Sequence, residues 1–447
     1  MNENHSPHDE HSLIEDRLGE RARVYGMERA ILVAVERPGE EIEGALDELE
    51  SLADTAGISV VAVLTQKRLR PDRATFIGKG KVSELKAAAS ELGADVIILN
   101  DELSPAQARN LEKELNRKVV DRTQLIMDIF AQRATTKEAR IQVELAQLRY
   151  LLPRLRGWGS ALTRLGGGIG TRGPGETQLE LDRKKIYRRV HALERRLAKA
   201  GSERELKSKR REASSLPHIV LAGYTNSGKS TLLNRLCQVD AFVEDKLFAT
   251  LATTVRRGEV SPGRWALCTD TVGFIRDLPH HLVPAFASTL EAVRHADLIL
   301  HVVDFSRPSC EEDCRTVLTI LDQEVFASDD ATRPVIITLL NKADLVDPEK
   351  ALPTIFDDGL RISAKEGMQL DRLRERVRAV LDQGRERVSF LIPYARSSLL
   401  HHLSQQREVS ICGYTEDGIE IEACLPTAEI ARLQGAGARL RPSSSPK

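Results

Sequence analysis

The chain has 447 residues, of which 65 are Lys or Arg and 66 are Asp or Glu, so its formal net charge is −1. This balance identifies no partner, and a hydrophobic share of 41% is ordinary for a globular chain with full cores. The length predicts about three domains. No run of about 18 apolar residues occurs, which argues against a membrane span, and residues 1–20 lack the apolar centre of a secretory signal. We therefore expect a cytoplasmic protein, and we expect a monomer.

The first ordered part of the chain alternates apolar runs with helical segments. The runs are Ile31–Val35, Val60–Leu64 and Val96–Leu99, and the helical segments are Glu41–Ala53, Val82–Leu92 and Pro105–Leu115. Strands that alternate with helices predict a small parallel sheet. We place this α/β module at residues 23–135, after a polar tail at residues 1–22 that we expect to be disordered.

Two helical stretches follow, each with one apolar stripe. The stripes have the spacing i, i+4, i+7 and i+11, and their members are Ile141, Leu145, Leu148 and Leu152 in the first stretch and Ile186, Val190, Leu193 and Leu197 in the second. Two such stripes joined by a loop predict an antiparallel helical hairpin, which we place at residues 136–213. The glycine-rich loop Gly157–Thr177 would form its tip.

Two further parts complete the chain. A second α/β alternation occupies residues 217–384, and a small α+β module occupies residues 385–434, followed by a tail at residues 435–447 that we expect to be disordered. The predicted elements of the last module are strands at Val388–Ile392, Val409–Cys412 and Ile419–Leu425 and a helix at Ala395–Gln406.

A complete P-loop motif opens the second α/β domain. It follows the apolar run Ile219–Ala222, and its residues are Gly223, Tyr224, Thr225, Asn226, Ser227, Gly228, Lys229 and Ser230. Glycines let backbone N–H groups approach phosphate oxygens, and the N-terminus of the following helix adds partial positive charge. We expect Lys229 to reach the β- and γ-phosphates and the Ser230 hydroxyl to be a Mg²⁺ ligand.

Three shorter motifs follow in order, each at the end of a predicted strand. They are Asp270-Thr271-Val272-Gly273, Asn341-Lys342-Ala343-Asp344 and Ser363-Ala364-Lys365. We expect Asp270 to hold Mg²⁺ through water, and the Gly273 N–H to contact the γ-phosphate. The Asp344 carboxylate can accept from both N1–H and N2–H of guanine, a donor pair that adenine lacks. The ordered set predicts a GTP- and GDP-binding domain, with a mostly parallel sheet and helices on both faces, that hydrolyses GTP.

A threonine between the P-loop and Asp270 must close on Mg²⁺ and the γ-phosphate for the domain to act as a switch. The residues that we expect at the nucleotide are Phe248, Ala249, Thr250, Leu251 and Ala252. From the residues alone, Thr250 and Thr254 are both candidates, and both could instead be ordinary strand residues. The predicted catalytic set is Lys229, Thr250 and Gly273.

Many GTPases place a glutamine directly after the glycine of the Asp270–Gly273 motif, where it orients the attacking water. This chain has Phe274 at that position, and a phenyl ring can neither accept a proton nor hold that water. We therefore predict slow hydrolysis by the protein alone, and faster hydrolysis when a partner arranges the site.

Several segments outside these motifs are not found in GTPases in general. They are Phe76–Lys81, Asp101–Pro105, Asp121–Thr123, Asp128–Ala134, Gln142–Leu148 and Arg172–Glu180. Together with the phrase Asp270–Ile275, they make the chain resemble the HflX family of ribosome-associated GTPases, which are similar to the TrmE-Era-EngA-Obg GTPases. The resemblance extends from about Arg23 to Leu433.

The resemblance implies that the protein binds the large ribosomal subunit and couples its GTPase cycle to ribosome splitting or rescue, under stress. It also favours Thr250 over Thr254 as the Mg²⁺ ligand, because in related GTPases the threonine of a Thr-Leu pair binds the metal. The chain departs from the family at Ala252-Thr253, where similar proteins usually read Asp-Pro, and this departure leaves the shape of the segment open.

The hairpin carries a local excess of positive charge. Residues 183–211 contain thirteen Lys or Arg and few acids, and cations attract RNA phosphates. The expected RNA contacts at the tip are Arg154, Arg156, Trp158, Arg164 and Arg172, with Trp158 able to stack on an unpaired base. A solvated basic helix with a flexible connector would show the same composition. The alternative functions are a regulatory GTP switch that acts on another RNA or protein partner, and an RNA-binding protein whose nucleotide site is only structural.

Overall fold

The computed structural model describes residues 28–39, 42–154, 183–201, 216–238, 247–248, 254–261, 264–276, 287–326, 333–349, 351–383, 385–406 and 409–441. The chain divides into two compact units. The first comprises residues 1–200 with residues 245–251 and 277–285, and the second comprises the remaining residues. The tail at residues 1–22, the hairpin tip Gly157–Thr177 and the end of the C-terminal tail, residues 442–447, lie outside the described residues.

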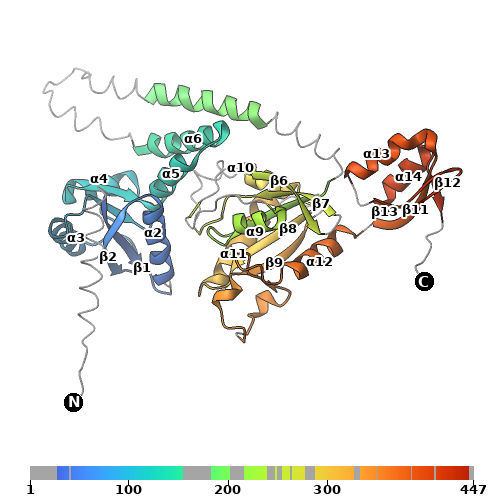
Figure 1. Ribbon diagram of the computed structural model, residues 1–447. Coiled ribbons are helices and arrows are strands. Elements are labelled where there is room, and N and C mark those ends of the chain that lie inside the picture. Colours follow the sequence, from blue (N-terminus) through green and yellow to red (C-terminus); the bar gives the residue numbers. More distant parts are fainter. Residues whose placement is uncertain are drawn as a thin grey trace, which may run out of the picture. The chain divides into compact units, whose positions relative to one another are not determined.

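A parallel sheet forms the centre of the first unit (Figure 1). Its strands are β1 (Arg29–Glu36), β2 (Ser59–Lys67), β3 (Val96–Leu99) and β4 (Lys118–Asp121), in the order β2-β1-β3-β4. The helices α3 (Lys79–Glu91) and α4 (Pro105–Leu115) share a core with one face of the sheet, and α2 (Glu43–Thr55) packs with α5 (Arg122–Arg133). The predicted parallel sheet is confirmed. The sequence did not reveal β4, because only two of its four residues, Val119 and Val120, are apolar, which is too short a run to indicate a strand.

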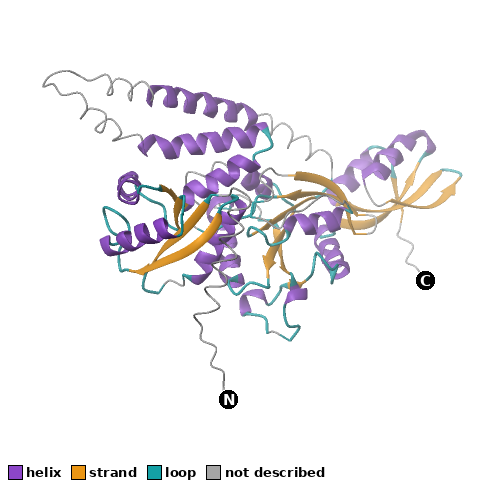
Figure 2. Cartoon of the chain, turned by 60° about the vertical axis from the view of Figure 1, so that its left-hand side comes forward, coloured by secondary structure: helices purple, strands orange, loops and turns teal. Residues whose placement is uncertain are grey.

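The predicted hairpin stripes meet in the first unit. The helix α6 (Lys137–Arg154) and the helix at residues 183–201 run side by side (Figures 1 and 2). Leu145, Val190 and Leu193 are buried between them, and the other five stripe residues pack against this cluster. Ion pairs between Arg149 and Glu194 and between Arg189 and Glu144 join the rims of the two helices.

A buried carboxylate joins this hairpin to the sheet. Asp121 is 2% exposed and accepts hydrogen bonds from the Tyr150 hydroxyl at 2.7 Å and from the Arg154 guanidinium at 2.8 Å. Arg154 also donates to the Leu103 carbonyl oxygen and lies over the Tyr150 ring. Burial and the Asp121 charge raise the pKa of Tyr150, so its hydroxyl remains a donor. These contacts give Arg154 a structural role, which replaces the RNA contact expected from its charge, because a buried carboxylate requires a cation.

Replacing Arg154 with Met should destabilise the first unit, because the buried charge of Asp121 then loses its cation. We expect the free energy of unfolding to fall by about 3 kcal/mol, and amide hydrogen exchange in α6, followed by mass spectrometry, to become faster. Arg149→Met breaks an exposed ion pair on the same helix and should have little effect. Equal protection of α6 in the two variants would contradict the structural role of Arg154.

A six-stranded sheet forms the centre of the second unit. Its strands are β5 (His218–Gly223), β6 (Thr254–Ser261), β7 (Arg264–Asp270), β8 (Leu298–Asp304), β9 (Val335–Asn341) and β10 (Leu360–Arg361), in the order β10-β9-β8-β5-β7-β6. All pairs are parallel except β6 with β7. The helices α9 (Lys229–Cys237) and α12 (Leu370–Leu381) share the core of one face. The other face carries α10 (Ala287–Arg294) and α11 (Cys310–Ile320), which continues as a π-helical turn, η2 (Leu321–Val325).

A four-stranded antiparallel sheet completes the second unit. Its elements are β11 (Arg385–Ile392), η5 (Tyr394–Arg396), α13 (Ser397–Gln406), β12 (Val409–Thr415), β13 (Gly418–Pro426), α14 (Thr427–Gly435) and β14 (Arg439–Arg441), with strand order β12-β13-β11-β14. The strand β14 lies within the tail that we expected to be disordered from residue 435 onward. That expectation is wrong for residues 439–441, because the pairing with β11, and not an apolar run, makes this exposed segment a strand.

The predicted fold class is confirmed, with a P-loop domain between an α/β module with its hairpin and a small α+β module. None of the described helices combines the length and the apolar character needed to cross a bilayer.

Candidate nucleotide-binding site

The P-loop encloses the ammonium group of its own lysine. Strand β5 ends at Gly223 and α9 begins at Lys229. The Lys229 Nζ donates to the carbonyl oxygens of Gly223 at 3.1 Å and Tyr224 at 2.7 Å. Gly228 adopts φ 92°, and a Cβ added there would lie 2.2 Å from Asn341 Nδ2, so both the backbone and the space require glycine at this position. Thr225 and Ser227 are buried in the loop, and Asn226 has a φ of 58°.

Burial lowers the pKa of Lys229 to about 8, although the charge of Asp270 acts in the opposite direction. His301 of β8 is fully buried, and neither ring nitrogen has a hydrogen-bond partner among the residues that the structure describes. Burial, and then the charge of Lys229, lower the pKa of His301 to about 4. The imidazole is therefore neutral near neutral pH, and it adds no second charge near the phosphate site.

Two hard oxygen donors meet beside the P-loop. The Ser230 hydroxyl donates to Asp270 Oδ2 at 2.5 Å, and Asp270 is 2% exposed. Carboxylate and hydroxyl oxygens are donors that suit Mg²⁺. The residues present therefore fit the magnesium site expected from the sequence.

The Asp270–Gly273 motif lies against the start of the P-loop. The Thr271 hydroxyl donates to the Leu221 carbonyl oxygen at 2.6 Å. A Cβ on Gly273 would lie 2.5 Å from the Cα of Thr225, so a larger residue would displace the loop. Val272 is fully buried.

Phe274 joins the motif to the P-loop through its backbone. Its N–H donates to the Gly223 carbonyl oxygen at 3.1 Å, and its carbonyl oxygen accepts from the Thr225 N–H at 2.7 Å. The side chain of Phe274 is fully buried. The ring is thus a packing group, and the backbone of this residue positions the neighbouring Gly273.

Asn341 connects the Asn341–Asp344 and Ser363–Lys365 motifs to the P-loop. Its Nδ2 donates to the Ser227 carbonyl oxygen at 2.8 Å, and its Oδ1 accepts from the Ala364 N–H at 2.9 Å. Lys342 has a φ of 60° and forms an ion pair with Asp304 at 2.7 Å. The short helix η3 (Ala343–Leu345) follows and leaves Asp344 exposed. The structure thus brings the Asn341–Asp344 and Ser363–Lys365 motifs together, with one carboxylate accessible to a base.

Arg235 was missed by the sequence analysis. It lies on α9, and its Nε and Nη2 donate to the carbonyl oxygens of Ala364 at 3.2 Å and Lys365 at 2.6 Å. The P-loop helix therefore holds the loop after β10 as well as the phosphate site. An arginine on an amphipathic helix carries no local signal of this role, since its partners are 129 and 130 residues away.

The structure corrects the expectation for Phe248. Its ring is 2% exposed and packs edge-on against Phe130 of the first unit, with the ring centroids 4.7 Å apart. The neighbouring Leu247 N–H donates to the Thr55 hydroxyl at 3.3 Å. The side chain of Phe248 is therefore a packing group and not a nucleotide contact, because an apolar ring is more stable in an apolar pocket than beside phosphates.

The other expected residues of this segment, Ala249, Thr250, Leu251 and Ala252, lie outside the described residues. Thr254 is the first residue of β6 and pairs with Asp270. Its backbone therefore has the role of an ordinary strand residue, which was one of the readings left open by the sequence.

The fold and the site define a P-loop GTPase. Models of three families match the chain, described as GTP-binding GTPase N-terminal over residues 43–131, GTP-binding GTPase Middle Region over residues 133–211 and 50S ribosome-binding GTPase over residues 218–342. The chain is 48% identical to GTPase HflX of Caldanaerobacter subterraneus, covering 89% of this chain and 90% of that protein. It is 44% identical to GTPase HflX of Escherichia coli over 72% and 74% of the two chains.

The chain therefore belongs to the HflX family of GTPases, and it is a GTP hydrolase. A GDP complex of a GTP-binding protein from Sulfolobus solfataricus is 24% identical and covers 80% of this chain and 99% of that one. Its TM-score is 0.42, a value that adds nothing to the assignment.

The buried histidine predicts an acid-sensitive stability. His301 has a folded pKa of about 4 and an ordinary value of 6.5, so between these values the unfolded chain binds a proton that the folded chain does not. The contribution of the neutral imidazole to the free energy of unfolding is fully present above about pH 6.5. As the pH falls toward 4, this contribution is lost, and the free energy of unfolding decreases by about 3 kcal/mol. We expect His301→Leu to remove this part of the loss in urea denaturation measured across that range. An unchanged pH slope would assign the effect to another group.

Proposed function

We propose that this GTPase binds the large ribosomal subunit and couples GTP binding and hydrolysis to ribosome splitting or rescue under stress. Family membership supports the proposal, since one matching family is described as 50S ribosome-binding GTPases. In this proposal the protein acts as a cytoplasmic monomer, and its RNA contacts lie on the helical hairpin and its glycine-rich loop.

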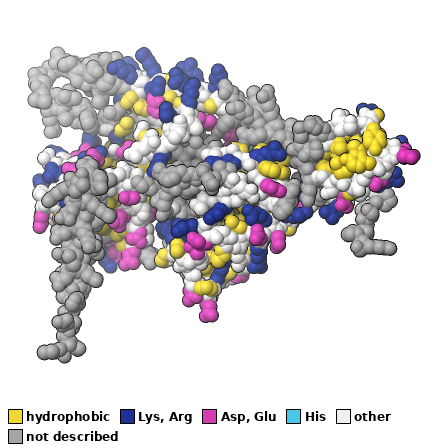
Figure 3. Space-filling model, in the orientation of Figure 1, with side chains coloured by type: hydrophobic (Ala, Val, Ile, Leu, Met, Phe, Trp, Pro, Cys, Tyr) yellow, Lys and Arg dark blue, Asp and Glu magenta, His cyan; other side chains and the backbone are white. Residues whose placement is uncertain are grey.

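The structural observation that best supports a ribosomal partner is the charged outer face of the hairpin. Lys184, Arg188, Arg195 and Lys199 are exposed and recur at intervals of four, seven and four residues. This spacing places them on one face of the helix, opposite the buried stripe of Val190 and Leu193. Figure 3 shows the Lys and Arg side chains gathered along this helix. Such a row of cations attracts the phosphates of an RNA backbone.

The tip residues Arg156, Trp158, Arg164 and Arg172 lie outside the described residues, and they remain part of the proposal. The exposed Tyr187, with 44% of its surface accessible, adds an aromatic ring at the side of the basic face. Stacking of an unpaired base on such a ring is a common contribution to RNA binding.

We propose that Ser230 and Thr250 hold Mg²⁺ directly and that Asp270 holds it through water. Mg²⁺, when bound, neutralises charge on the β- and γ-phosphates. In the proposed cycle Lys229 contacts the same phosphates, and Thr250 and the Gly273 N–H contact the γ-phosphate only while GTP is bound. Ligand contacts that exist in one state and not the other are what allow GTP and GDP to favour different conformations.

The burial of Phe274 supports slow hydrolysis by the protein alone. A fully buried ring cannot reach the water that attacks the γ-phosphate. The orientation of that water would therefore depend on other groups, which a bound partner orders. The ribosome is the partner in the proposal.

The ribosomal partner can be tested by sedimentation with the three nucleotide states. We expect the protein to pellet with ribosomes in GTP and in a nonhydrolysable analogue, and much less in GDP. Lys184→Ala, Arg188→Ala and Lys199→Ala together should weaken binding and reduce the salt dependence of log K by about one unit per cation, with GTP affinity unchanged.

A matched control removes three exposed lysines elsewhere in the first unit, Lys86, Lys113 and Lys118. It should leave ribosome binding nearly unchanged. Equal pelleting in all nucleotide states would contradict the proposed function and favour the alternative, a GTP switch that acts on another RNA or protein. An effect of the control as large as that of the helix variant would remove the basic face from the proposal.

The role of Asp344 as the guanine-reading acid predicts a change of base preference. Asp344→Asn keeps one oxygen, which can still accept from N1–H, and replaces the other oxygen with an amide N–H donor. This donor opposes N2–H of guanine, but it can donate to the carbonyl oxygen that xanthine has in place of the N2 amino group. We expect GTP affinity to fall by about 3 kcal/mol, more than a hundredfold, and affinity for XTP to rise, measured by calorimetry. Retained GTP preference would contradict this assignment.

A further inference from the structure

The start of the segment that follows Gly273 is held at more points than its motif requires. The backbone of Phe274 pairs with Gly223 and Thr225, and the intervening P-loop residue, Tyr224, reaches further along the segment. Its hydroxyl accepts from the backbone N–H of Arg276 at 2.8 Å. Three consecutive P-loop residues therefore hold two residues of the segment.

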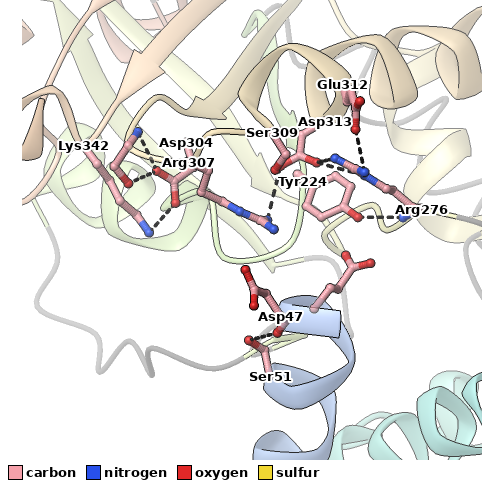
Figure 4. Close-up of polar contacts among 12 residues, drawn as sticks. Asp47, Ser51, Tyr224, Arg276, Asp304, Arg307, Ser309, Glu312, Asp313 and Lys342 are labelled. Carbon is pink, nitrogen blue, oxygen red and sulfur yellow. Dashed lines mark hydrogen bonds and ion pairs between the residues drawn. The ribbon is translucent and has the colours of Figure 1, made fainter. Parts of the chain in front are cut away.

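A second element holds the same arginine from the other side. The Arg276 guanidinium donates to Asp313 Oδ1 at 3.0 and 3.3 Å and forms an ion pair with Glu312 at 2.6 Å, both on α11. Figure 4 shows Arg276 between Tyr224 and these two carboxylates. Arg276 is thus tied through its backbone to the P-loop and through its side chain to α11.

The acceptor in this network is itself fixed. Asp313 is 3% exposed, and its second oxygen accepts from Arg307 at 3.2 Å and from the Ser309 hydroxyl at 3.3 Å. Arg307 also lies over the face of the Tyr224 ring, with its charge 5.5 Å from the ring centroid. A carboxylate bound by two guanidinium groups in a buried position is held in one orientation.

We propose that Arg276 is a positioning residue for γ-phosphate recognition, anchored by Tyr224 and Asp313. The proposal rests on the role of Gly273 proposed above. Arg276 lies three residues after Gly273, and the anchor keeps the intervening backbone against the P-loop. The amide of Gly273 is then ordered before the nucleotide arrives, and it can donate to the γ-phosphate without further loss of backbone entropy.

The anchor should matter for GTP and not for GDP. GDP has no γ-phosphate, so it gains nothing from an ordered Gly273 amide. When the anchor is cut, binding of the γ-phosphate must order the segment again. The loss should appear only in the affinity for the triphosphate, and this distinguishes positioning from a general contribution to folding.

The test compares a nonhydrolysable GTP analogue with GDP by calorimetry in the full chain with Mg²⁺. We expect Arg276→Met and Asp313→Asn to weaken analogue binding about tenfold and to change GDP binding by less than about twofold. Tyr224→Phe, which removes only the hydroxyl acceptor, should have the same sign and a smaller size. Arg276→Lys keeps the charge and should recover part of the loss.

Asp322→Asn is the matched control. Asp322 lies on η2, which continues α11, and it forms an exposed ion pair with Arg333 at 2.9 Å. The substitution should leave both affinities unchanged. Equal weakening of the analogue and GDP in the Arg276 and Asp313 variants would overturn the proposal in favour of a structural role. No weakening of either ligand would overturn it as well.

Hydrogen exchange in the wild-type chain separates this inference from the role of Gly273. If the analogue protects the backbone of residues 270–276 more than GDP does, the γ-phosphate contact of Gly273 stands, and the variants test only the anchor. If the two ligands protect these residues equally, the role of Gly273 fails, and the inference fails with it.

Discussion

The buried ammonium group of Lys229 determines the path of the P-loop. A charge taken out of water costs several kcal/mol unless polar groups replace the water, and here the carbonyl oxygens of Gly223 and Tyr224 do so. The loop is therefore closed around its own cation.

The other motifs of the P-loop domain that the structure describes are attached to that loop. Asn341 binds the Ser227 carbonyl oxygen and so holds the base-reading loops, and Phe274 binds Gly223 and Thr225 and so holds the start of the switch. The α9 helix adds Arg235 on the guanine side. One rigid loop thus sets the distance between the phosphate end and the base end of the site. The proposed contacts with guanine and with the γ-phosphate would therefore depend on the same backbone.

The segment with the predicted Mg²⁺ threonine is attached differently. Phe248, two residues before Thr250, is packed against Phe130 in the first unit. The hairpin of the same unit separates its functions by helix face, since an apolar stripe holds the two helices together and a row of cations faces solvent.

Much of the nucleotide site could be predicted from the sequence because its chemistry is local. A glycine-rich turn between a strand and a helix exposes the backbone N–H groups that bind phosphate, and the order of the later motifs, Asp270–Gly273 and Asn341–Asp344, indicated GTP. The hairpin stripes were equally readable, since a helical period records which face is buried.

The tertiary structure decided the roles that depend on distant partners. Arg154 pairs with an acid 33 residues away and Arg276 with one 37 residues away, and no pattern in the chain indicates those distances. By its position in the sequence, Phe248 was expected beside the nucleotide, but its ring packs against Phe130 in the core of the first unit. The sequence by itself determined which ligand the protein binds, because backbone geometry and side-chain type specify it over a few residues. Only the fold decided which cations are exposed to a partner and which form ion pairs within the protein, because the two members of an ion pair are close in space and can be far apart along the chain.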